Sequence, residues 1–243
     1  MKKLAVGFFV ANGLWLGASL LLGRPLLPSP LMVYPHLFRI LPLLLTHLSA
    51  SLSRVLVGLG GATLVGLLGG IAMGRSRWLD KIGEPLLYLA YPAPKLAFLP
   101  VILLLFGLGE LSKTLMVFLI LVFPMTIQIR DAIKGISSES YEVFQSLGAS
   151  KWQRLLHITL PAGLTQVLTA VRLSIGTALS VLFFAEVYGD RTGLGFFIMD
   201  AWGRINYLDM YSGLLMMSAL GLLLFLGIDT LSFFILKWQR PQK

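Results

Sequence analysis

Long apolar segments leave this chain few possible folds. Several stretches hold about 20 mostly apolar residues in a row, the length that crosses roughly 30 Å of hydrocarbon as an α-helix. Of the 243 residues, 56% are hydrophobic and only 13% are charged, whereas about a quarter are charged in ordinary soluble domains. A water-soluble fold cannot bury that much apolar surface, so we expect an all-α integral membrane protein.

The apolar pattern predicts about six transmembrane helices. We place them at Leu4–Gly23, Leu48–Gly74, Leu86–Gly107, Thr114–Ile129, Leu164–Val187 and Tyr211–Leu236. We interpret residues 1–243 as a single transmembrane domain with a core at 46–237. The proline-rich segment between the first two spans is expected to be an external loop with a short interfacial helix.

The distribution of Lys and Arg orients these spans. With the N-terminus inside, the inner face holds twelve cations: Lys2, Lys3, Arg75, Arg77, Lys81, Arg130, Lys134, Lys151, Arg154, Lys237, Arg240 and Lys243. The outer face holds five: Arg24, Arg39, Lys113, Arg191 and Arg204. Because cytoplasmic loops keep more Lys and Arg, we expect both termini in the cytoplasm. We interpret the net charge of +9 as facing anionic lipid, not nucleic acid.

Small residues recur at every fourth position of the second span. They are Gly58, Ala62, Gly66, Gly70 and Gly74. Such a stripe lets another helix approach closely, because no bulky side chain separates the two backbones. We therefore predict that this stripe packs against another helix and does not contact a transported solute.

Prolines interrupt the third span. Each of Pro92 and Pro94 removes a backbone donor and tends to kink the helix, and broken backbone at membrane depth must be buried or line water. Tyr91, Pro92, Pro94 and Lys95 are thus candidates for a pathway wall, with a merely kinked packing helix as the alternative. Lys95 either extends to the inner interface or attracts an anionic substrate.

Three other charged residues lie within or at the ends of spans, where charge is costly. Glu186 ends the fifth span and is a candidate gate, or a structural partner of Arg191. Arg172 is expected to pair with a neighbouring helix or a carbonyl. Asp229 lies close enough to the inner end of the last span to be hydrated or paired.

The longest polar stretch, residues 131–163, is expected in the cytoplasm. Ser138 to Leu147 is predicted to form a short helix, and Gly148 permits a turn that a residue with a β-carbon would resist. Ser150 to Gln153 matches a capping box that starts a second helix, which runs on to Pro161. This pattern predicts a compact elbow suited to docking in a groove of a partner, although spacing alone also fits an ordinary loop.

The same loop resembles the signature loop of binding-protein-dependent ABC permeases, which couples the permease to its ATPase. The family pattern is Glu-Ala-Ala, three residues, Gly, nine residues, then Ile-x-Leu-Pro. The matching positions here are Glu142, Val143, Phe144, Gly148, Ala149, Ile158, Leu160 and Pro161. Val143 and Phe144 replace the two alanines, and the spacing is unchanged.

Other motifs resemble the nitrate, sulfonate and taurine branch of that family. They are Leu27-Pro28-Ser29-Pro30, His47-Leu48-x-x-Ser51-Leu52-x-Arg54-Val55, Tyr91-Pro92-x-Pro94-Lys95, Phe106-Gly107-x-Gly109-Glu110 and Ala185-Glu186 followed by Gly193-Leu194-Gly195. The resemblance implies a type I importer permease in a bacterial cytoplasmic (inner) membrane. It also implies a homodimer, two cytoplasmic ATPase subunits that bind ATP and magnesium and hydrolyse ATP, and an external substrate-binding protein.

The chain lacks the motifs of an energy source or a catalyst of its own. No G-x-x-x-x-G-K-[ST] phosphate loop occurs, nor H-E-x-x-H or G-x-S-x-G. It has no cysteine, and its three histidines, His36, His47 and His157, are scattered. We therefore expect no catalytic residue, metal or cofactor in this chain. A self-driven carrier and a membrane-embedded enzyme are the alternatives, and the solute is left open between a nitrate-, sulfonate- or taurine-like anion and a pyrimidine vitamin precursor.

Overall fold

The computed structural model describes residues 2–23, 26–189 and 191–236, with only the backbone described for residues 2–5. The structure is 87% helical and contains no strand in the described part of the chain. The all-α prediction is confirmed. The predicted core end at 237 and the cations at 24, 237, 240 and 243 lie outside the described residues, and the prediction of a single domain stays a prediction.

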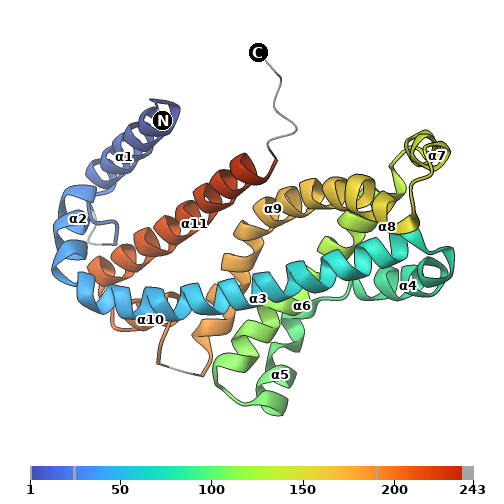
Figure 1. The fold of residues 1–243 in the computed structure, drawn as a ribbon. Helices are drawn as coiled ribbons and strands as arrows, with labels where there is room; N and C mark the ends of the chain where they lie inside the picture. The colour runs from blue at the N-terminus through green and yellow to red at the C-terminus, as the bar shows by residue number, and fades with distance from the viewer. Residues whose placement is uncertain (1, 24–25, 190, 237–243) are drawn as a thin grey trace. The chain divides into compact units, whose positions relative to one another are not determined.

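The helices follow one another with short connections (Figure 1). The α-helices are α1 Lys2–Leu22, α2 Pro30–Arg39, α3 Leu41–Arg75, α4 Arg77–Ala90, α5 Leu99–Phe106, α6 Glu110–Lys134, α7 Ser138–Ser146, α8 Lys151–Arg154, α9 Leu160–Val187, α10 Leu194–Gly203 and α11 Tyr207–Ile235. A 3₁₀ turn, η1, covers Lys95–Phe98, and a π-helical turn, η2, covers Leu155–Thr159.

Four stretches of the described chain are long and apolar enough to cross a membrane: Leu41–Arg75, Glu110–Lys134, Lys151–Val187 and Tyr207–Ile235. A fifth is counted if Arg77–Ala90 and Lys95–Phe106, which are bent by 79°, form one broken span. The first predicted span corresponds to α1, Lys2–Leu22, whose described side chains, from Val6 to Leu22, form an apolar helix. A multi-pass helical membrane protein is therefore confirmed, with one predicted span broken.

The chain divides into two compact units. The first comprises Met1–Leu52 and Glu186–Leu220, and the second comprises Ser53–Ala185 and Gly221–Lys243. The chain passes from one unit to the other within α3, at the end of α9 and within α11.

In the second unit, the glycine stripe of α3 lies against α6. A β-carbon built on Gly66 would lie 2.9 Å from the β-carbon of Met125, and one on Gly70 would lie 2.7 Å from that of Ile129. Real β-carbons do not approach so closely, so these positions tolerate no side chain without movement. The predicted packing role of the stripe is confirmed. The partner residues on α6 recur four apart as well, which keeps the two helices in contact over several turns.

Around this contact the core of the second unit is apolar. Met116, Leu121 and Met125 of α6 are buried together with Ala178 and Leu182 of α9. Helix α6 is therefore a central element of this unit, since it contributes side chains to the contact with α3 and to the core shared with α9.

The first unit holds α1 against the segment that follows it. Trp15 donates its indole N–H to the carbonyl of Pro28 over 3.1 Å, and the Ser19 hydroxyl donates to the carbonyl of Leu27 over 2.9 Å. The Tyr34 hydroxyl of α2 donates to the Asn12 side chain over 2.7 Å. The short helix expected between the first two spans is thus α2, and these bonds fix it beside α1.

Candidate functional site

The first half of the polar loop is helix α7, which ends in a glycine-dependent turn. Gly148 has φ +77, a backbone conformation that glycine adopts without the steric cost of a β-carbon. Its N–H donates to the carbonyl of Gln145 over 3.0 Å, and the N–H of Ala149 donates to that of Phe144 over 2.9 Å. This pair of bonds is the Schellman arrangement that closes a helix C-terminus. The predicted bend at Gly148 is confirmed.

The second half of the loop starts at a capping box. The Ser150 hydroxyl accepts from the N–H of Gln153 over 3.2 Å, and the Gln153 side chain accepts from the N–H of Ser150 over 2.7 Å. The helix does not stop at Pro161 but continues as α9 after the π-helical turn η2. A wider turn relieves the clash between a proline ring and the carbonyl four residues earlier. The elbow is therefore continuous with a long helix.

Side-chain contacts hold the two halves of the elbow together. Arg154 donates to the side chain of Gln145 over 2.9 Å, and the hydroxyls of Tyr141 and Thr159 lie 3.0 Å apart. The rings of Phe144 and His157 stack with centroids 6.5 Å apart. Phe144, which stands where the family has alanine, thus packs inside the elbow, and Figure 1 shows α7 as a separate short helix beside α8.

The outer surface of the elbow is apolar and exposed. Val143 is 57% exposed, Leu147 78% and Trp152 66%, and the Glu142 side chain is exposed as well. Most of the remaining predicted coupling residues are half-buried, namely Phe144, Ala149, Ile158, Leu160 and Pro161. The predicted set therefore divides into an exposed surface and a support that joins it to α9.

The predicted pathway region forms a sharp bend between α4 and η1. Pro94 has no N–H, so the carbonyl of Ala90 lacks its normal helical donor. The ammonium of Lys95 takes that place, donating to the carbonyl of Ala90 over 2.7 Å and to that of Tyr91 over 2.9 Å. Lys95 also lies over the Phe123 ring, 4.9 Å from its centroid. The Lys95 side chain therefore turns back onto the end of α4.

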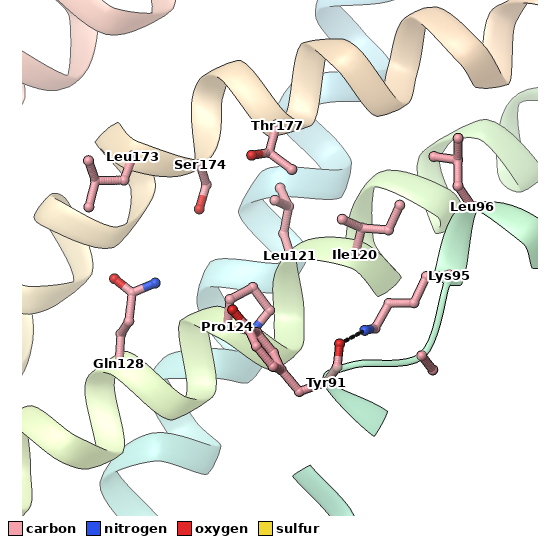
Figure 2. A pocket seen from close by; sticks show the side chains of 11 residues that line it. Tyr91, Lys95, Leu96, Ile120, Leu121, Pro124, Gln128, Leu173, Ser174 and Thr177 are labelled. Carbon is pink, nitrogen blue, oxygen red and sulfur yellow. Dashed lines mark hydrogen bonds between the residues drawn. The ribbon is translucent and has the colours of Figure 1, made fainter. Parts of the chain in front are cut away.

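A pocket of about 400 Å³ lies beside this bend (Figure 2). Its polar lining consists of Tyr91, Lys95, Gln128, Ser174 and Thr177. Figure 2 shows these side chains around one space, with Gln128 on α6 and Ser174 and Thr177 on α9. Two of the predicted pathway residues, Tyr91 and Lys95, thus lie in the pocket, whereas Pro92 and Pro94 form the bend and are not among its lining residues.

Sequence reasoning missed the other three polar residues of the lining: Gln128, Ser174 and Thr177. Each is a polar residue inside an otherwise apolar span, and Ser174 and Thr177 are three apart, which places them on one face of a helix. That spacing was the available signal. What it does not reveal is that the same space is also bordered by Lys95, which is far away along the chain.

The fifth predicted pathway residue, Glu186, belongs to the first unit. It is fully buried and accepts the Ser51 hydroxyl over 2.8 and 2.9 Å. It also accepts the N–H of Gly195 over 2.8 Å, while the N–H of Leu194 donates to the Ser51 oxygen over 2.8 Å. Leu194 and Gly195 open α10, so Glu186 and Ser51 cap the N-terminus of that helix.

Ion pairs account for other charged groups in the second unit. Arg54 is buried and donates to Glu110 over 2.6 Å. Arg172 of α9 pairs with Asp229 of α11, which confirms the expectation that Arg172 finds a partner on a neighbouring helix. In the described residues no cluster of three or more His, Cys, Asp or Glu side chains forms a possible metal site.

A second ionic group joins α4 to α6. Arg130 is 4% exposed and pairs with Asp80 and, over 2.9 Å, with Glu84. Lys134 also donates to Asp80. Charge-assisted hydrogen bonds of this kind are stronger than neutral ones, so they tie the start of α4 to the end of α6.

Comparison with known proteins identifies the family. The model of the binding-protein-dependent transport system inner membrane component matches residues 62–242. The taurine transport system permease protein of Escherichia coli (strain K12) is 34% identical over 233 residues, which cover 93% of this chain and 85% of that protein. The formylaminopyrimidine transport permease protein of Halalkalibacterium halodurans is 27% identical, over 97% of this chain and 95% of its own.

A solved structure agrees with the fold. A chain of the MetNI methionine ABC transporter, in an inward-facing conformation, superposes with a TM-score of 0.66. The match covers 82% of this chain and 99% of that chain, at 17% sequence identity. At this level of identity the likeness concerns the fold.

The fold is that of a membrane-spanning transport subunit. The chain belongs to the family of binding-protein-dependent transport system inner membrane components. It is the permease subunit of an ABC importer, a family of subunits without an ATPase site of their own.

Proposed function

We propose that this permease is driven through the elbow at residues 131–163. Glu142, Val143 and Gly148 would seat in a groove of the ATPase. The exposed apolar side chains on a well-capped elbow carry this proposal, because an exposed apolar patch of this kind favours a protein partner.

The half-buried part of the elbow would connect this contact to the membrane. Phe144 and Ala149 would shape the elbow from inside, while Ile158, Leu160 and Pro161 would pass its movement into α9. The continuity of the elbow with α9 through η2 supports this role.

The assembly proposed around the chain has five parts. Two copies of the permease would form the membrane core, two cytoplasmic ATPase subunits would bind ATP and magnesium and hydrolyse ATP, and an external binding protein would deliver the solute. The permease itself would hold no cofactor. Residues 1–243 would act as one transmembrane domain in a bacterial inner membrane, with both termini in the cytoplasm, as the distribution of Lys and Arg predicts.

The solute proposed for this importer is a small polar molecule. Tyr91 and Lys95 line the pocket beside the α4 bend, and we place the pathway there, with Pro92 and Pro94 shaping the bend. The two relatives are named for taurine and for formylaminopyrimidine, so the class of solute here lies among small anions, zwitterions or pyrimidines. Glu186 would act within the first unit, by holding α10.

The elbow proposal is tested by co-purification with the ATPase encoded beside the permease gene. Detergent-solubilised wild type is compared with a Glu142→Ala, Gly148→Val double variant, and with Gly148→Asn as a matched control. A β-carbon at Gly148 meets no atom within 4 Å, so substitution there changes backbone strain alone, and asparagine tolerates positive φ better than valine. We expect the double variant to lose at least about tenfold in ATPase binding, about 1.4 kcal/mol, and Gly148→Asn to keep most of it.

Other outcomes have clear meanings. If the double variant and Gly148→Asn both bind the ATPase as well as wild type does, the elbow is not the coupling element. A wild-type permease that binds no ATPase would favour the self-driven carrier or the membrane-embedded enzyme.

A further inference from the structure

The pocket beside the α4 bend carries a positive charge that its own walls do not neutralise. Lys95 is the charged residue of the lining, and no Asp or Glu is among the residues that line it. Among the described residues, no carboxylate lies within ion-pair distance of the Lys95 ammonium. The carbonyls of Ala90 and Tyr91 accept two of its three N–H groups, but carbonyls carry no net charge.

One N–H of Lys95 is left for a ligand. The hydroxyls of Ser174 and Thr177, the Tyr91 hydroxyl and the Gln128 amide are further donors from the lining. A group with several acceptor oxygens and a negative charge satisfies such a set of donors. A cationic amine finds no carboxylate here, and a neutral heterocycle leaves the charge of Lys95 without a counter-ion.

The remaining walls are apolar. Leu96, Ile120, Leu121 and Leu173 border the same space, and its volume of about 400 Å³ exceeds that of a bare inorganic anion. A short hydrocarbon chain would lie against these side chains with a favourable loss of water contact. The pocket thus has one charged, hydrogen-bonding end and one apolar side.

We infer that this pocket binds a small monovalent oxyanion with a short apolar chain, in preference to a zwitterion or a neutral pyrimidine. The charged head lies at Lys95 with the hydroxyls of Ser174 and Thr177. The chain lies against the apolar side of the pocket, formed by Leu96, Ile120, Leu121 and Leu173. The inference rests on the proposed function, because it takes this pocket as a binding site for the solute on the proposed pathway. It adds the class of solute and the residues that select it.

The absence of cysteine from the sequence allows a direct test of the charge. Thr177→Cys places a single thiol in the pocket, in the full chain purified in lipid nanodiscs without ATPase. Its reaction rate is measured with two methanethiosulfonate reagents of similar size, one carrying a sulfonate and one carrying a trimethylammonium group. The ratio of the two rates reports the local potential, and Ser146→Cys on the elbow serves as the thiol outside the pocket.

Three second substitutions separate charge from structure. Lys95→Gln removes the cation, Gln128→Glu neutralises the pocket while leaving the Lys95 bonds to α4 in place, and Lys81→Gln removes an exposed lysine from α4 as the matched control. We expect Lys95→Gln and Gln128→Glu each to lower the anion-to-cation rate ratio at residue 177 by about tenfold. Lys81→Gln should leave it unchanged, and ethanesulfonate should slow the reaction more than taurine or formylaminopyrimidine does.

The opposite results overturn the inference. An unchanged rate ratio in both pocket variants shows that Lys95 does not set the potential, and an unreactive thiol at residue 177 shows that the pocket does not admit a ligand. Stronger protection by the neutral pyrimidine or by taurine also rejects an anion site. Because no ATPase is present, these outcomes are independent of whether the elbow binds one.

Discussion

Glu186 is a carboxylate that the structure buries at the start of a helix. Both of its oxygens accept the Ser51 hydroxyl, and one also accepts the N–H of Gly195. The first N–H groups of a helix lack partners within it, and negative charge is favoured there. Glu186 therefore has a structural task that explains its burial: it holds α10 to the end of α9 and to the part of α3 that carries Ser51.

Removing this cap should destabilise the protein. We expect Glu186→Gln to lower the free energy of unfolding by about 1–3 kcal/mol, because the amide offers a donor where Ser51 also donates. Ser51→Ala should cost a similar amount, and the double variant should lose less than the sum of the two. Thermal unfolding in detergent measures this, with Glu139→Gln on the exposed face of α7 as control. Fully additive losses would show that Glu186 and Ser51 act independently.

Helix α3 meets α6 through its glycine stripe. Small residues four apart bring the two backbones together, and packing, not water exclusion, drives such contacts in lipid. The stripe is therefore expected to be sensitive to any added atom. Gly60, on the same helix, should tolerate an added side-chain atom, because a β-carbon built there has no atom within 4 Å.

Two glycines of α3 give a matched pair of variants. Gly70→Ala should destabilise the protein by about 1–3 kcal/mol, because its β-carbon would lie 2.7 Å from that of Ile129. Gly60→Ala should be neutral or stabilising, since alanine is the better helix former by about 1 kcal/mol. Unfolding by a denaturing detergent compares the two. Equal losses at both positions would mean that α3 does not pack through the stripe.

The broken third span marks the limit of what its prolines predict. Pro92 and Pro94 predict a kink, and the chain bends by 79° between the two helical pieces. The prolines do not tell where the unpaired carbonyls find donors. The Lys95 ammonium supplies them, a contact that depends on the path of the chain after the bend.

The ion pair of Arg172 and Asp229 indicates that this part of the protein surface does not face lipid. Their side chains are 42% and 36% exposed, on two stretches that are apolar enough to span a membrane. Charge at membrane depth is costly in contact with lipid. In the proposed assembly, either the second permease copy or a water-filled path would shield this pair from lipid.

Replacing one residue of the Arg172–Asp229 pair should destabilise the protein more than replacing both. Arg172→Leu leaves Asp229 without its partner at membrane depth and is expected to cost about 3 kcal/mol, whereas Arg172→Leu with Asp229→Leu should recover most of that loss. Yield and monodispersity in size-exclusion chromatography, together with the midpoint of thermal unfolding, report the effect. Arg204→Leu, which breaks an exposed ion pair with Asp200 at the C-terminus of α10, is the control. Equal loss in the single and double variants would show that the two residues do not stabilise each other.

Local patterns in the sequence were enough to establish the class of the protein, the positions of most spans and the elbow. Apolar length, glycine spacing and the Gly148 and Ser150 turns are local properties, and local rules of helix formation and termination decide them. The family resemblance at Glu142 to Pro161 depends on spacing in the same way, and comparison with known proteins confirmed the family.

Which distant residues meet was decided by the packing of the helices. Gln128, Ser174 and Thr177 join Lys95 in one pocket, and Ser51 meets Glu186, although these side chains lie far apart along the chain. The sequence around an isolated polar residue in an apolar span does not indicate which distant residue it contacts. Its role follows from the neighbours that surround it, and those neighbours are set by the packing of whole helices.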